Sequence, residues 1–88
     1  MNGRALVAWN LRRLRTERGL SQERLAADTG VDRAYVSELE RAQANASVDL
    51  LDRLAEVLTA PLAEFFMEPQ DPENPPAALR SGRRPKNG

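Results

Sequence analysis

Apolar residues recur every three to four positions along most of the chain, which is the spacing of helices with one buried face. In segment 4–18, Val7, Leu11 and Leu14 share one side, and arginines occupy much of the remainder. Gly19 follows, and glycine is the residue with which helices most often end in a left-handed backbone conformation. The pattern predicts a first helix over this segment.

Two shorter helices are predicted next. Ser21 is a favourable N-cap for the second helix, and Gly30 is a favourable end for it. The inward positions of this helix are Leu25, Ala26 and Thr29. Asp32 begins a third helix that runs to about Arg41, and its carboxylate is expected to accept hydrogen bonds from the first backbone N–H groups.

The helical pattern resumes after the loop "AQANA". Ser47 is expected to cap a fourth helix that ends near Leu58. The inward positions of this helix are Val48, Leu51, Leu54, Ala55 and Leu58. Pro61 suits the first turn of a short fifth helix that ends near Phe66. Because no strand pattern appears, the sequence predicts an all-α fold of five helices.

The composition changes after Met67. Residues 68–88 hold five of the six prolines and almost no large apolar side chains. Such a segment cannot bury enough apolar surface to fold. We therefore expect one helical domain over residues 1–67 and an extended or disordered tail over residues 68–88, Pro-rich at first and basic at its end. The basic end could reach along DNA or simply keep the chain in solution.

The chain has 13 Lys and Arg, 13 Asp and Glu, no Cys and no His. Without Cys and His the commonest metal ligands and neutral-pH bases are absent, and no Gly-rich phosphate loop or inward pair of carboxylates is visible. We therefore expect no metal, no cofactor and no enzymatic activity. The longest apolar run near the N-terminus, residues 5–9, is too short to span a bilayer, so a cytoplasmic location without membrane contact is expected.

The segment Gln22–Arg41, "QERLAADTGVDRAYVSELER", has the spacing of a helix-turn-helix unit. Two helices that cross closely need a small residue at their contact, and Ala26 stands there. The turn needs a residue that tolerates a positive φ, and Gly30 follows four residues later. The core positions of such a unit would be Leu25, Thr29, Val31, Val36 and Leu39.

The chain resembles the Xre/Cro-like helix-turn-helix proteins, also called lambda-repressor-like, over roughly residues 7–66. The resemblance rests on "LRRLRTERGLSQERLAADTGVDRAYVSELER" and "NASVDLLDRLAEVL". The pattern "VDRAYVSELER....N.S" is also similar to the controller proteins of restriction–modification systems. The resemblance implies a small transcription regulator that binds palindromic double-stranded DNA as a homodimer. The third helices would then enter successive major grooves about 34 Å apart.

The predicted third helix and its cap carry three acids and two arginines, an unfavourable sum for a DNA-reading helix. A helical wheel separates these charges. Asp32 is the cap, and Glu40 flanks the core face, where the resemblance implies a partly buried bridge to Arg15; a solvated Glu40 is the alternative. The outward face then consists of Arg33, Ala34, Ser37, Glu38 and Arg41.

Four of these outward residues are expected to read bases, namely Arg33, Ala34, Ser37 and Glu38. Arg33 can donate to guanine O6 and N7, and Glu38 can accept from cytosine N4. The alternatives for Arg33 are a phosphate contact or a solvated side chain. Glu38 could instead orient Arg33 or Arg41, or merely repel phosphate. Ala34 could touch a thymine methyl or only permit close approach, and Ser37 could face a base edge, a phosphate or solvent.

Six further residues are expected to contact phosphates: Ser21, Gln22, Tyr35, Arg41, Asn45 and Ser47. The resemblance implies the role of Gln22, at a helix N-terminus that faces the DNA backbone. For Tyr35 the alternative is a packed ring whose hydroxyl meets the protein backbone, because its position borders the core.

The loop after the third helix departs from the family. Members often read "ERGKRNPS" where this chain has "ERAQANAS". If Ala42 must adopt the left-handed conformation of the usual glycine, the strain costs about 1 kcal/mol. The loss of two basic residues from this loop is expected to lower non-specific affinity for phosphate.

Apolar residues on the last two helices exceed what one small core needs. The residues expected either to form the dimer surface or to belong to the ordinary core are Leu50, Val57, Leu62 and Phe65.

Residues 1–68 also carry nine arginines and eleven acids, whereas a nucleic-acid binder usually has an excess of basic residues. An antitoxin or adaptor that acts mainly through a protein partner, such as a toxin, is therefore the alternative function.

Overall fold

The computed structural model describes residues 1–69 and consists of helices with no strand in that range. In chain order the elements are α1 (Gly3–Glu17), α2 (Gln22–Thr29), α3 (Arg33–Glu40), α4 (Val48–Leu58) and the 3₁₀ helix η1 (Leu62–Phe66). The predicted all-α class is confirmed. The fifth helix is a short 3₁₀ turn, and Pro61 precedes it instead of lying in its first turn. The predicted tail lies almost entirely outside the described residues.

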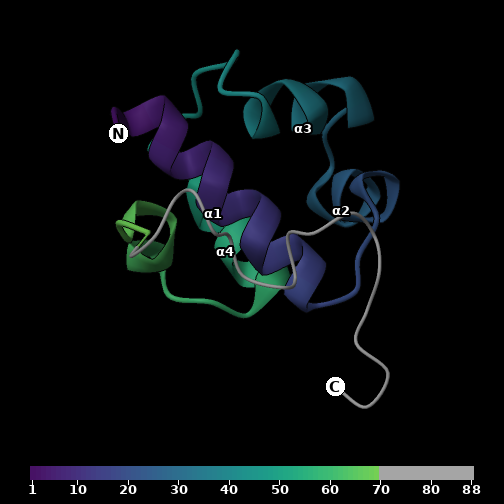
Figure 1. Cartoon of the computed structure of the whole chain (residues 1–88). Helices are drawn as coiled ribbons and strands as arrows, with labels where there is room; N and C mark the ends of the chain where they lie inside the picture. Colours follow the sequence, from purple (N-terminus) through teal and green to yellow (C-terminus); the bar gives the residue numbers. More distant parts are fainter. Residues whose placement is uncertain (70–88) are drawn as a thin grey trace, which may run out of the picture.

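Helix α1 is the central element of the fold (Figure 1). It contacts α3 along one side and η1 along another, and α2 links α3 to α4. Figure 1 shows α3 at the outer edge of the molecule and η1 on the opposite side of α1. The helix expected to read DNA is therefore peripheral, although its inner face packs on the core.

The core fills the space between all five elements. Its largest fully buried apolar side chains are Leu11, Leu14, Leu25, Val36, Leu39, Leu54, Leu58 and Phe65. One predicted inward position is wrong, since Val48 is 65 % exposed. At 100° per residue, Val48 lies about 120° around α4 from Leu54, at the edge of the buried face.

The serine caps form as predicted, whereas the aspartate cap does not. The Ser21 hydroxyl accepts a hydrogen bond from Arg24 N at 2.9 Å, and the Ser47 hydroxyl accepts one from Leu50 N at 3.0 Å. Asp32 occupies the N-cap position of α3, but its carboxylate accepts no capping hydrogen bond. Asp32 is exposed, so water can solvate both the carboxylate and the first N–H groups of α3.

All four α helices end in the same left-handed turn, in which the residue after the left-handed one donates its N–H to the carbonyl five residues earlier. The left-handed residue is Gly19 after α1, with φ 70°, and Gly30 after α2, with φ 84°. It is Ala42 after α3, with φ 60°, and Thr59 after α4, with φ 52°. The glycine stops were predicted from the sequence, whereas the sequence left open whether α3 would end with a left-handed Ala42, and it does.

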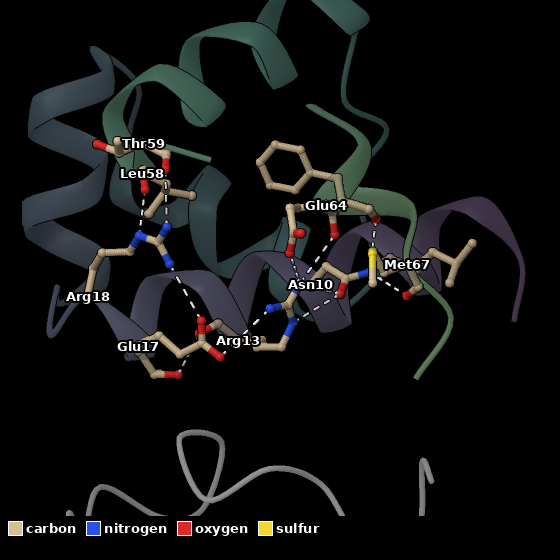
Figure 2. A network of polar contacts seen from close by, with 11 residues as sticks. Asn10, Arg13, Glu17, Arg18, Leu58, Thr59, Glu64 and Met67 are labelled. Atoms are coloured by element: carbon tan, nitrogen blue, oxygen red, sulfur yellow. Dashed lines mark hydrogen bonds and ion pairs between the residues drawn. The ribbon is translucent and has the colours of Figure 1, made fainter. Parts of the chain in front are cut away.

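A polar cluster on α1 fastens η1 to the core (Figure 2). The Asn10 side chain is fully buried, and its amide donates to the backbone carbonyls of Phe65 at 3.0 Å and Met67 at 2.9 Å. Arg13 donates to Asn10 Oδ1 at 3.1 Å and to Glu64 Oε1 at 2.8 Å. Side chains of α1 therefore satisfy the polar backbone groups of a segment too short to satisfy its own.

A second contact joins the end of α1 to the end of α4. The Arg18 guanidinium donates to the carbonyl oxygens of Leu58 and Thr59, which the α4 ladder leaves open (Figure 2). Helix α1 thus holds both C-terminal elements by side-chain to backbone hydrogen bonds, in addition to apolar packing.

Candidate nucleic-acid interface

The turn between α2 and α3 has the close geometry expected of a helix-turn-helix unit. Ala26 is 3 % exposed, and its carbonyl accepts from Gly30 N at 2.8 Å and Val31 N at 3.0 Å. Thr29 is buried as predicted, but its hydroxyl finds no hydrogen-bond partner in the described part of the chain. The small residue and the glycine therefore allow the contact between α2 and α3 that the sequence predicted.

Three side chains from three helices meet behind the inner face of α3. Arg15 donates to both carboxylate oxygens of Glu40, at 2.6 and 3.0 Å, and both side chains are largely buried. Gln22 Nε2 donates to the same carboxylate at 3.0 Å. The predicted bridge is confirmed, and it fixes α3 against both α1 and α2 through charge-assisted hydrogen bonds.

The outward face of α3 forms a shallow open depression of about 350 Å³. It is lined by the five residues assigned to that face, namely Arg33, Ala34, Ser37, Glu38 and Arg41. Apart from half-buried Ser37, these residues are exposed. The sequence-based wheel therefore grouped these side chains on one surface, with two arginines and one glutamate.

The charged side chains on this surface differ in whether they have hydrogen-bond partners. Among residues 1–69, neither Arg33 nor Glu38 takes part in a side-chain hydrogen bond or an ion pair. Arg41 instead donates from Nη1 to the Ser37 hydroxyl and from Nε to Gln43 Oε1, the latter at 3.1 Å. Ser37 therefore contacts an arginine of its own helix, an arrangement that the sequence reading did not include.

Two expected phosphate ligands have their polar groups engaged inside the protein. One N–H of the Gln22 amide is bound to Glu40, which leaves a single N–H for another acceptor. The Tyr35 hydroxyl donates to the carbonyl of Asn45 at 2.9 Å, so its only proton is not available to a phosphate in this arrangement. The alternative of a packed Tyr35 ring with its hydroxyl at the backbone is the one observed.

The family model described as "Helix-turn-helix", HTH_3, matches residues 11–65. The chain belongs to this helix-turn-helix family. The matched segment contains α2, α3 and the Arg15–Glu40 bridge, so the family match and the geometry concern the same part of the molecule.

The relatives of this helix-turn-helix chain are transcriptional regulators. It is 37 % identical over 68 residues to a hypothetical transcription factor of Neisseria meningitidis, covering 77 % of this chain and 64 % of that protein. It is 45 % identical over 58 residues to the uncharacterised HTH-type transcriptional regulator y4dJ of Sinorhizobium fredii, covering 66 % of this chain and 75 % of y4dJ. The chain thus spans less than two thirds of the Neisseria relative.

A solved controller structure is also similar. The restriction–modification controller protein C.AhdI of Aeromonas hydrophila superposes with a TM-score of 0.69 and 43 % identity, over 72 % of this chain and 96 % of that chain. The helix-turn-helix fold is therefore shared with a protein of the class that the sequence motif indicated.

The expected dimer residues need correction at two positions. Leu50 is 6 % exposed and Phe65 is fully buried, so both side chains serve the core of one protomer. Of the two alternatives left open by the sequence, the ordinary core is therefore the one observed for these two residues. Val57 and Leu62 are half-buried. The large apolar side chains most exposed near η1 are instead Phe66, at 46 %, and Met67, at 50 %.

Sequence reasoning missed the polar cluster that holds η1. One signal was available, since Asn10 stands three residues after Val7 and four before Leu14, on the buried face of α1. A polar side chain at such a position needs a buried partner. Gln43 carried no comparable signal, because its contact with Arg41 depends on the path of the loop.

No helix within residues 1–69 is long and apolar enough to cross a membrane. Within the same residues, no cluster of acidic, histidine or cysteine side chains is arranged to hold a metal ion.

Proposed function

We propose that this chain is a sequence-specific DNA-binding regulator that inserts α3 into the major groove of double-stranded DNA. The observation that carries the proposal is the outward face of α3. It presents Arg33 and Glu38 without side-chain partners among residues 1–69, while the acid at the end of the helix, Glu40, is neutralised by Arg15. Unpartnered donors and acceptors on a peripheral helix are the groups that can pair with base edges.

The charge of the helix supports this reading. Glu40 is paired with Arg15, and Asp32 lies at the start of the helix, outside the outward face. That face therefore holds two arginines and one glutamate. A guanidinium can donate two parallel hydrogen bonds to guanine, and a carboxylate can accept from cytosine N4. Arg33 and Glu38 together therefore favour a site that contains guanine and cytosine.

We further propose that two copies bind together on a palindromic operator. Helix α3 has only eight residues, so one copy can contact only a short half-site. Near η1, the exposed Phe66 and Met67, with half-buried Val57 and Leu62 nearby in sequence, offer apolar side chains for self-association. The polar cluster of Asn10 fixes the backbone that carries Phe66 and Met67.

The test is a selection of binding sites from a random duplex pool with the full-length protein, followed by gel shift and sedimentation. The expected result is a two-fold symmetric site bound by a dimer, with half-sites about one helical turn apart. An asymmetric site bound by a monomer would contradict the proposed dimeric binding. If no duplex competes against random DNA in moderate salt, DNA reading is wrong and the protein-partner alternative replaces it.

A further inference from the structure

Arg41 differs from the other arginines whose guanidinium groups are held in place. Arg13, Arg15 and Arg24 each form an ion pair with a carboxylate, at 2.8, 2.6 and 3.0 Å. Arg18, which donates to two backbone carbonyls, also has an ion pair, with Glu17 at 3.5 Å. Arg41 is held by two neutral acceptors, the Ser37 hydroxyl and the Gln43 side-chain oxygen, and has no ion pair within residues 1–69. Its orientation is therefore restricted while its positive charge stays uncompensated.

The two contacts within residues 1–69 use only part of the donor capacity of the Arg41 guanidinium. A guanidinium carries five N–H donors. The Nε donor is used by Gln43 and one Nη1 donor by Ser37, so the remaining donors lie on Nη1 and Nη2. Two adjacent guanidinium nitrogens with free N–H groups can bind two oxygens of one phosphate.

The loop that supplies Gln43 is itself braced. Left-handed Ala42 reverses the chain, and Gln43 N donates to the Glu38 carbonyl at 2.9 Å. Two residues further on, the Tyr35 hydroxyl donates to the Asn45 carbonyl at 2.9 Å. The oxygen that orients Arg41 therefore comes from a loop tied at two points to α3.

We infer that Ser37 and Gln43 are positioning residues that hold the Arg41 guanidinium ready for one phosphate of the DNA backbone. The position along α3 favours phosphate over a base, because the first residues of a reading helix meet the base edges. Ser37 then acts through Arg41 and reads no base, in contrast to the role the sequence suggested. This inference rests on the proposed function of α3.

The test compares full-length wild type, S37A, Q43A, R41A and the double variant S37A/R41A. The probes are a 30-base-pair duplex selected by the wild-type protein and a scrambled duplex of the same composition. R41A is expected to weaken binding to both duplexes and to reduce the salt slope by about 0.9, as expected for one lost phosphate contact. S37A and Q43A are expected to weaken both by about 2- to 10-fold through lost preorganisation.

The double variant carries the decisive comparison. If Ser37 acts only through Arg41, S37A/R41A binds as R41A does, because there is no guanidinium left to orient. R53A is the matched control, since Arg53 is an exposed arginine on α4 with no ion pair in residues 1–69. It removes the same charge away from α3 and is expected to leave the salt slope nearly unchanged.

A measurement without DNA separates this inference from the proposed function. The Arg41 Nε–H group is expected to show a higher NMR order parameter in the wild type than in S37A or Q43A. Equal order in all three proteins would overturn the inference even if the wild type binds DNA. So would a changed base preference in S37A, or an additive loss in the double variant. Failure of the wild type to select any duplex would instead overturn the proposed function.

Discussion

Gln22 Nε2 lies 3.0 Å from Glu40 Oε1 and donates a hydrogen bond to it across the junction of α2 and α3. The amide that the family resemblance directed toward DNA thus also belongs to the bridge between Arg15 and Glu40. One side chain at the start of α2 therefore connects the expected backbone contact with the orientation of α3.

Substitution of Gln22 by alanine is expected to lower both stability and DNA affinity. The lost hydrogen bond to a carboxylate lowers the free energy of unfolding by on the order of 1–2 kcal/mol. Affinity is expected to fall evenly on selected and random duplexes, because no base contact is lost. Gln22→Glu is the sharper variant, since it places a second carboxylate beside Glu40. Urea denaturation and gel shift measure the two effects, and a Gln22→Ala protein of wild-type stability would contradict the contact.

Substitution of Arg33 by alanine is expected to relax sequence preference. Because Arg33 has no internal partner in the described residues, its removal should leave stability within about 0.5 kcal/mol. The loss of a paired contact to guanine lowers discrimination at one base pair by about 1–3 kcal/mol. Competition between the selected duplex and single-base variants measures this change. Equal losses on specific and random duplexes would show that Arg33 contacts phosphate instead.

Substitution of Asn10 by alanine is expected to release η1. The change leaves the carbonyls of Phe65 and Met67 without their donor, at a cost of about 1–3 kcal/mol for each group that stays buried. Amide hydrogen exchange should accelerate at Glu64, whose N–H donates to the carbonyl of Pro61 at the start of η1. Arg24→Ala is the control, because it removes only the exposed pair with Asp28 on α2. Unchanged exchange at Glu64 in the Asn10 variant would argue against the clamp.

Substitution of Thr29 by valine is expected to stabilise the fold. The Thr29 hydroxyl is buried and has no hydrogen-bond partner within residues 1–69, and valine replaces it with a methyl group of similar shape. The gain is expected to be about 1 kcal/mol, the lower end of the cost of an unsatisfied buried group. Thr16→Val is the matched control, because the Thr16 hydroxyl donates to the Arg12 carbonyl at 2.8 Å. Thermal unfolding should separate the two, with a higher Tm only for the Thr29 variant.

Glycine at either strained helix end is expected to raise stability. Ala42 and Thr59 hold φ values of 60° and 52°, and glycine at each site removes a clash that costs about 1–2 kcal/mol. Greater freedom of glycine in the unfolded chain offsets part of this, so the net gain is up to about 1 kcal/mol. Gly30→Ala tests the reverse change, because an added Cβ there meets no atom within 4 Å and only the backbone is strained. Destabilisation by Ala42→Gly would contradict this account.

Much of the helical fold was predictable because the relevant signals are local. The periodicity of Leu11 and Leu14, the serine caps and the glycine stops act within one or two turns of the chain. The wheel of α3 likewise placed Arg33 and Glu38 outward, because side-chain direction on a helix follows from spacing alone, whereas the bridge of Glu40 to Arg15 was expected from the family resemblance.

The sequence by itself determined the four α helices, most of their inward apolar positions and the charged surface of α3. Only the tertiary structure decided which polar groups remain free to bind DNA. Gln22 meets a partner 18 residues away, Tyr35 one 10 residues away and Asn10 one 55 residues away. Spacing along one helix cannot reveal such pairs, because hydrogen-bond partners are set by how the helices pack and by the path of the loops. Packing also assigned Phe65 to the core and left Phe66 exposed, although both are equally apolar.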